Sequence, residues 1–236
     1  MLNLERLLAR NLPCSRKDAR RLLDGEAADL PREIPPGALP FRIDIGGRSL
    51  ELHDSFHLML NKPAGCVTAL SDSTHDTAAA HIHSAPLSAE LRPVGRLDLD
   101  TTGLLLWTTD GTWLHRLTHP RTEIPRTYQA ALQRPFQALP SDLVLRDGHR
   151  PNILDLRPIV ADEIHPSLVK PASATNFATI TIVGGAYHEV RRIFAALGSH
   201  VLSLCRVSFG ELKLPNDLPL GGWQPITRGS VEKKED

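Results

Sequence analysis

Hydrophobic positions near the start of the chain repeat with the period of a helix. Apolar residues at positions 4, 7 and 8 are followed by a second set at 19, 22 and 23, the spacing of one buried helix face. Pro13 separates the two sets, and Ser15 with Asp18 three residues later forms a capping-box pattern. The pattern therefore predicts two short helices, the second exposing four basic side chains: Arg16, Lys17, Arg20 and Arg21.

The next forty residues change from helical to strand character. The Pro-rich stretch LPREIPPGALP (residues 30–40) interrupts regular structure. The segments FRIDI and RSLEL then lie on either side of Gly46 and Gly47, which is typical of a β-hairpin. We expect this first domain to span residues 1–54.

Strand-like patterns dominate the rest of the chain, residues 55–236, which we expect to form a second domain. The segment HEVRRIFAALG (188–198) is the exception, with a helical apolar stripe at 190, 193, 194 and 197 and Gly198 at its C-terminal end. Because the strands do not alternate regularly with helices, the pattern predicts an α+β fold with a mostly antiparallel sheet. The predicted strands are HLMLNKP from residue 57, RTYQAAL (126–132), NFATITIV (176–183) and HVLSLCRVSF (200–209).

Composition narrows the class of protein without identifying it. The hydrophobic fraction of 41% and the charged fraction of 23% are ordinary for a globular chain of 236 residues. No apolar run approaches the roughly 18 residues of a membrane span, and the charges near the N-terminus do not fit a secretory signal. The three widely spaced cysteines indicate reduced thiols, so we expect a cytoplasmic protein. We also expect a monomer, and a disordered C-terminal tail with the sequence VEKKED.

Charge is distributed unevenly, although the chain has 27 basic and 27 acidic side chains. Residues 1–23 carry six basic and two acidic side chains, a local net charge of +4. Such an excess is consistent with a polyanionic partner such as RNA. A solvated helix face without a partner explains the same cluster, and the sequence leaves both interpretations open.

Two acids, Asp98 and Asp100, precede the apolar run LLLW in RPVGRLDLDTTGLLLWTTDG (92–111). Together with Thr102 they match the D-x-D-x-T pattern of phosphatases that use an aspartyl nucleophile and magnesium. In those enzymes the first acid ends a buried strand, whereas here it follows the polar stretch RPVGR. An ordinary turn stabilised by Asp side chains is the other alternative for an isolated pair.

Four motifs that follow one another along the chain favour a third interpretation of these two acids. The segment GRLDLDTTGLLLWTTDG (95–111) closely resembles the signature of pseudouridine synthases of the small-subunit rRNA type. Three further segments resemble the remaining motifs of that family: MLNKPAGCVT (59–68), PRTYQAAL (125–132) and GGAYHEVRRIFAALGSHVLSLCR (184–206). The N-terminal segment CSRKDARRLL resembles the small S4-type RNA-binding domain that often precedes this catalytic domain.

The resemblance implies a function and a site. It implies that one uridine of rRNA is isomerised to pseudouridine, with 16S rRNA as the favoured target and Asp98 as the catalytic acid or nucleophile. It also implies that Tyr128 stacks on the target base, that Arg191 pairs with Asp98, and that Arg96 lies at the substrate. One carboxylate suffices for this reaction, so no cofactor, nucleotide or metal is expected. We interpret Asp100 as a turn-stabilising residue.

Some features keep alternatives open. Glu189 stands where the small-subunit enzymes often carry Gln and is also seen in relatives that act on large-subunit rRNA, so a large-subunit rRNA synthase is one alternative. A non-catalytic RNA- or ribosome-binding protein is another. The segment DGEAADLPREIPPG replaces the strand and Gly turn of an S4 domain. His75, His81 and His83 suggest a metal site, but no second ligand group accompanies them, so we interpret them as loop or surface residues.

Overall fold

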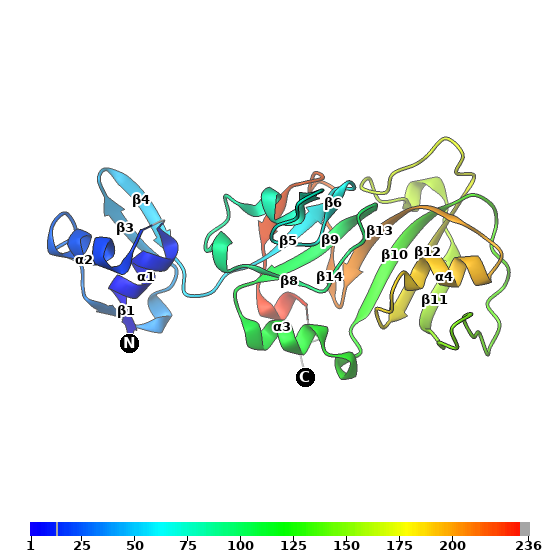
Figure 1. Cartoon of the computed structure of the whole chain (residues 1–236), viewed down its shortest axis with the longest axis horizontal. Helices are drawn as coiled ribbons and strands as arrows, with labels where there is room; N and C mark the ends of the chain where they lie inside the picture. Colours follow the sequence, from blue (N-terminus) through cyan, green and yellow to red (C-terminus); the bar gives the residue numbers. More distant parts are fainter. Residues whose placement is uncertain (13, 232–236) are drawn as a thin grey trace. The chain divides into compact units, whose positions relative to one another are not determined.

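The computed structural model describes residues 1–12 and 14–231, which form two compact units (Figure 1). The first unit comprises Met1–Phe56 together with His83–Leu91, and the second comprises His57–Ile82 and the chain from Arg92 onward. The sequence predicted a single division at residue 54, which placed residues 83–91 in the second domain, whereas the structure groups them with the first unit. Arg10 binds Glu90 in the structure, a link between residues 80 positions apart that leaves no local signal in the sequence. Pro13, the predicted interruption, and residues 232–236 of the predicted tail lie outside the described residues.

The first unit contains the predicted helix pair and the predicted hairpin. Ser15 and Asp18 form the capping box that starts the second helix, as the sequence predicts. The Pro-rich stretch contributes one short strand, which pairs with the start of the chain. The elements are β1 (Leu2–Asn3), α1 (Leu4–Asn11), α2 (Arg16–Asp24), β2 (Glu33–Ile34), β3 (Phe41–Ile45) and β4 (Arg48–Leu52). Their common core includes Leu4, Leu7, Leu8, Ala19, Leu23, Ile43 and Leu52.

A sheet of nine strands in the described chain forms the centre of the second unit (Figure 1). Seven strands follow in the order β11-β12-β10-β13-β9-β5-β15, while β8 pairs with β9 and β14 with β13. All pairings are antiparallel except β9 with β13, so the predicted α+β fold with a mostly antiparallel sheet is confirmed. The strands are β5 (His57–Lys62), β8 (Arg92–Val94), β9 (Thr101–Thr108), β10 (Pro125–Leu132), β11 (Asn152–Pro158), β12 (Asn176–Val183), β13 (Val201–Phe209), β14 (Leu212–Lys213) and β15 (Trp223–Pro225). A separate parallel pair is β6 (Cys66–Val67) with β7 (Asp76–Thr77).

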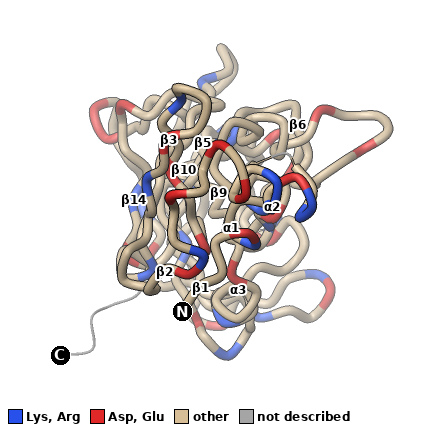
Figure 2. Tube along the Cα trace, turned by 90° about the vertical axis from the view of Figure 1, so that its left-hand side faces the viewer, with Lys and Arg blue, Asp and Glu red and all other residues tan. Residues whose placement is uncertain are grey.

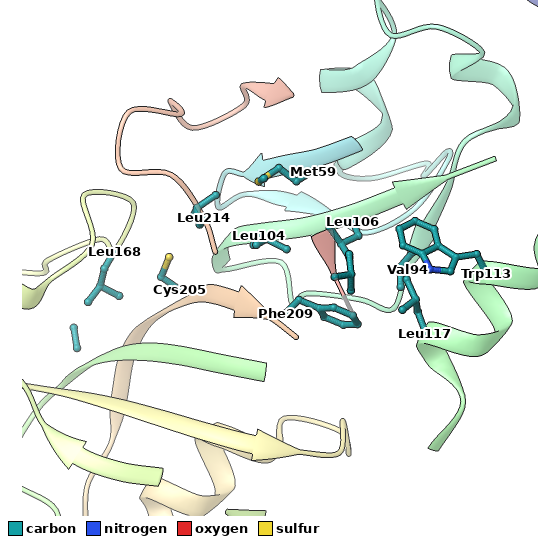
Figure 3. Packing of buried hydrophobic residues seen from close by; sticks show 12 residues of the cluster. Met59, Val94, Leu104, Leu106, Trp113, Leu117, Leu168, Cys205, Phe209 and Leu214 are labelled. Atoms are coloured by element: carbon teal, nitrogen blue, oxygen red, sulfur yellow. The ribbon is translucent and has the colours of Figure 1, made fainter. Parts of the chain in front are cut away.

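Two α-helices accompany the sheet, α3 (Gly111–Thr118) and α4 (Glu189–Ala196). Trp113 and Leu117 of α3 pack beside Val94 in the main core cluster, which Figure 3 shows together with Leu106 and Phe209. The predicted stripe of α4, at positions 190, 193, 194 and 197, is buried, and Gly198 follows with a left-handed φ of +78°. No helix in the described ranges is both long and apolar enough to cross a membrane.

Candidate active site

The turn between β8 and β9 carries Asp98, and a buried lysine fixes the backbone of this turn. Lys62, at the end of β5, is fully buried, and its Nζ donates hydrogen bonds of 3.0 Å to the carbonyls of Asp98 and Thr101. Burial lowers the pKa of Lys62. Thr68 adds a second anchor, since its hydroxyl accepts from the backbone N–H of Leu97 and donates to the carbonyl of Leu97. Lys62 and Thr68 therefore fix the backbone of the loop that carries Asp98.

Asp98 projects from this turn with about a third of its side chain exposed. Its Oδ1 lies 3.6 Å from Nε2 of His188, and its Oδ2 lies 3.8 Å from Nε of Arg191. Both partners come from the start of α4, so the turn before β9 and the start of α4 meet at one carboxylate. A carboxylate placed between two basic side chains is positioned to act as a nucleophile or a base.

Arg191 makes its closest ionic contact with Asp100. Its Nη2 lies 2.7 Å from Oδ1 of Asp100, about one ångström shorter than its contact with Asp98. Arg191 also donates to the carbonyl of Val201 at 3.4 Å. Asp100 was predicted to stabilise the turn, but the side-chain hydrogen bond that the structure describes for it goes to Arg191. The correction has a simple cause, since turn propensity reports only local bonds and Arg191 is 91 positions away.

A cleft of about 380 Å³ opens beside Asp98 and is lined by all four residues predicted for catalysis and substrate binding. Tyr128, on β10, is 8% exposed, while Arg96 is exposed in the loop that carries Asp98. Arg191 completes the set from α4. The volume lies within the usual range for small-ligand pockets. An aromatic ring, a carboxylate and two arginines in one cleft form a site for a planar base attached to an anionic backbone.

Residues 185–188 form another wall of the cleft, which the sequence did not predict. The last of these residues, His188, has a left-handed φ of +49°, and its ring stacks on that of Tyr187 with centroids 3.8 Å apart. Glu189 is buried and holds this segment by accepting from the backbone N–H of Ala186 at 2.9 Å. Its other oxygen lies 2.7 Å from Nε2 of His149. The YHEV pattern belongs to one of the four motifs and so marks these positions, but the sequence does not show that they line the cleft.

The predicted basic cluster lies on α2, in the other unit, where Figure 2 colours the trace of the basic residues blue. Its four side chains are exposed. Arg20 pairs with Glu5 at 2.9 Å and Arg21 with Asp18 at 3.8 Å. Arg16 and Lys17 have no ion pair among the described residues, so they are the two cations of the helix most open to an anionic partner. In the described chain, no three His, Cys, Asp or Glu side chains are grouped closely enough to hold a metal ion.

Comparison with known proteins identifies the family and the fold. The family model described as RNA pseudouridylate synthase matches residues 57–196, which include Asp98, Tyr128 and Arg191. The chain belongs to this family. It is 34% identical over 238 residues to the ribosomal small subunit pseudouridine synthase A of Escherichia coli K12, covering 98% of both chains. The protein of the same name from Haemophilus influenzae is 31% identical, with 98% of this chain and 99% of the other covered.

A solved structure agrees over the same length. The crystal structure of a pseudouridylate synthase superimposes with a TM-score of 0.60 at 28% identity and covers 98% of each chain. As a pseudouridylate synthase, the protein is an isomerase that converts uridine in RNA to pseudouridine. The resemblance of the four sequence motifs to this family is confirmed.

Proposed function

We propose that this protein isomerises a specific uridine of small-subunit (16S) rRNA, with Asp98 as the catalytic residue. The observation that carries the assignment of the site is the cleft that the paired Asp98 and Arg191 line together with the buried Tyr128. The target class is supported by the printed name of the relatives that match along 98% of the chain. A location in the cytoplasm is supported by the free state of all three cysteines.

The reaction exchanges one glycosidic bond for another. Asp98 acts at the sugar as nucleophile or base while the bond between C1′ and N1 of uracil breaks. The freed base turns in the cleft, and C5 forms a bond with C1′. The proton leaves C5, and N1 gains one, so the product is an isomer and neither oxidant nor nucleotide is consumed. Arg191 stands beside Asp98 as a permanent positive charge, since a guanidinium keeps its charge at any working pH.

Tyr128 and Arg96 have separate tasks in this proposal. A uridine reaches the cleft by leaving its stack, which costs a few kcal/mol, and stacking on an aromatic face returns roughly 1–3 kcal/mol. Tyr128 supplies that face. Arg96, exposed at the rim, meets the strand from which the uridine came.

The first unit, Met1–Phe56 with His83–Leu91, contains the S4-like helix pair and is proposed to bind RNA. Its support is the exposed basic face of α2, where Arg16 and Lys17 carry free positive charge and Arg20 and Arg21 form exposed ion pairs. Exposed ion pairs are weak, so phosphates can compete for both arginines.

Pseudouridine mapping tests the proposal directly. Ribosomal RNA from cells lacking the protein is expected to lack one pseudouridine in the small subunit, and the purified protein is expected to restore it in vitro. The assay includes excess EDTA and no nucleotide, conditions under which activity is expected to remain. Asp98→Asn is the matched inactive control.

The alternatives give different results in the same assay. Loss of a pseudouridine from large-subunit rRNA alone would replace the proposed target. An unchanged pseudouridine map, together with retained RNA binding, would instead favour a non-catalytic RNA-binding protein.

A further inference from the structure

A second cavity of about 520 Å³ adjoins the catalytic cleft and has no assigned role. The two cavities share Arg96, Tyr128 and Gly185 in their walls. Arg126 of β10 and Arg206 of β13 line only the second cavity. Any group bound here therefore lies next to whatever occupies the cleft.

Arg206 is buried and Arg126 is half-buried, and no anionic partner accompanies either of them in the described chain. Arg206 is 2% exposed, and both guanidinium groups lie over the ring of Phe209, at 5.0 Å for Arg126 and 5.4 Å for Arg206. Neither forms an ion pair within 4.0 Å among the residues that the structure describes. Burial, and then the charge of Arg206, lowers the pKa of Arg126. Like charges in a poorly solvated wall are unfavourable unless an anion accompanies them.

One of the two arginines, Arg206, also has an unsatisfied hydrogen-bond donor in the described chain. Nε of Arg206 donates to the carbonyl of Leu104 at 2.8 Å, whereas its Nη2 is buried with no partner in the described chain. Nη1 of Arg126 donates to the carbonyls of Gly184 and Ile124. A buried donor without an acceptor costs roughly 1–3 kcal/mol, so a bound acceptor would remove a real penalty.

The wall is suited to a phosphate group. Arg96, Arg126 and Arg206 face one lining carboxylate, Glu123, which is exposed. Gly184 and Gly185 leave part of the wall without side chains, which lets a ligand approach the backbone closely. Arginine is the side chain best shaped to bind two phosphate oxygens at once.

We propose that this cavity binds a phosphodiester of the RNA strand next to the nucleotide held in the catalytic cleft. The inference rests on the proposed function for the identity of the strand. A uridine in the cleft keeps its flanking phosphodiesters, and the shared wall of Arg96 and Tyr128 places the cavity within reach of one of them. The subsite thus fixes the sugar–phosphate chain while the base is free to turn.

Salt-dependent binding tests the charge contact without requiring turnover. Binding of a small-subunit rRNA transcript to Asp98→Asn protein is compared with binding to the same protein carrying Arg126→Gln. The loss of one phosphate contact is expected to flatten the log–log salt slope by about 0.7–0.9. Arg157→Gln is the matched control, because Arg157 lies on β11 and pairs with Glu163 outside the cavity. Equal slopes for the Arg126 and Arg157 variants would overturn the proposal.

A scan of neutral linkages then locates the contact. Methylphosphonates are placed one at a time around the modified uridine in an RNA fragment. One linkage is expected to weaken binding to the parent and to have no effect on Arg126→Gln, and an unchanged profile in the variant would overturn the proposal. If inorganic phosphate protects the parent from thermal unfolding but no linkage is sensitive, the cavity is a free-phosphate site and the RNA assignment is wrong.

Two controls keep the outcomes distinct. Should Arg126→Gln lose its fold, Arg126→Met keeps the stem that packs on Phe209 and makes the same test. Failure of the proposed function would show as absent pseudouridine with wild-type protein, whereas the binding measurements do not depend on isomerisation.

Discussion

At the scale of single residues, the two acids of the turn before β9 have different surroundings. Asp98 faces the cleft between His188 and Arg191, whereas Asp100 is 63% exposed and binds Arg191 from outside the cleft. The two acids are only two positions apart in the sequence, but Asp98 lines the cleft whereas Asp100 lies outside it.

Exchange of each acid for its amide tests that difference. Asp98→Asn is expected to reduce isomerisation to background, because the amide cannot act at the sugar. Asp100→Asn is expected to lose less than about tenfold, since Arg191 keeps its bond to Val201 and an amide oxygen can still accept from it. Single-turnover formation of pseudouridine measures both, and equal losses would contradict the assignment.

Arg191 supplies the permanent positive charge nearest Asp98. Its removal in Arg191→Met is expected to lower the single-turnover rate by about ten- to a hundredfold, because a charge contact at 3.8 Å in a partly solvated cleft is worth a few kcal/mol at most. Arg191→Lys is expected to retain a measurable part of the rate. Arg192→Met is the control, since Arg192 pairs with Asp147 and does not line the cleft. A rate for Arg191→Met equal to that of the control would show that the pairing has no role.

At the scale of elements, the parallel contact between β9 and β13 places the turn of Asp98 beside the centre of the sheet. Gly103 pairs with Arg206 there, and a Cβ at residue 103 would lie 2.3 Å from the carbonyl oxygen of Arg206. Its φ of +102° is also unfavourable for any other residue. The close approach of the two backbones requires glycine.

Gly103→Ala is therefore expected to lower the free energy of unfolding by about 3 kcal/mol or more. Gly111→Ala at the start of α3 is the control, because nothing lies within 4 Å of its added Cβ. Urea unfolding followed by circular dichroism gives both values. A loss at Gly103 no greater than at Gly111 would mean that the strands can separate without cost.

A buried histidine on β5, His57, is expected to make the free energy of unfolding depend on pH. His57 is buried with its Nδ1 2.7 Å from the hydroxyl of Thr108, and burial, followed by the charge of Arg228, lowers its pKa to about 4. In the unfolded chain that pKa is about 6.5, so the unfolded state binds more protons between those values. The free energy of unfolding is expected to fall, by at most about 2 kcal/mol from this residue, as pH decreases from about 7 to about 5.

Urea unfolding at both pH values measures the change. His53 and His165, whose pKa values are also lowered by burial, contribute in the same direction. His57→Gln should therefore reduce the pH dependence without removing it. An unchanged dependence would assign the whole effect to the other histidines.

The elements also show what sequence patterns contain. The periodic segments that became α1, α2, α4 and the β3–β4 hairpin were predicted because their signals are local. The edge strand β11 was missed, since its mixed exposure lacks strict alternation, and α3 was missed because only Trp113 and Leu117 in it are buried. Asp98, Tyr128, Arg191 and Arg96 were found through motifs. The contact of Arg191 with Asp100 and the burial of Arg206 depend on pairings across the sheet that no local pattern encodes.

At the scale of the whole molecule, RNA contacts are expected from both units, and their salt dependence separates them. Replacement of Arg16 and Lys17 by Ala should flatten the log–log slope of RNA binding by up to about 0.7–0.9 for each lost phosphate contact. Adding Arg20→Ala and Arg21→Ala should change it less, because those arginines already pair with Glu5 and Asp18. The isomerisation rate at saturating RNA should barely change. A slope identical to that of the wild type would mean that α2 does not touch RNA.

The discontinuous first unit has a consequence for how this protein can be cut and recombined. In the described chain the backbone passes between the units three times, near residues 56, 82 and 91, and Arg10 joins Asp54 to Glu90 within the first unit. Removal of residues 1–56 would leave residues 83–91 attached to the second unit without the rest of the first unit. Glu90 would then lose its bond to Arg10. A transplantable RNA-binding module would have to carry both pieces, so simple fusion at residue 54 should give hybrids that fold less well than hybrids that exchange 83–91 as well.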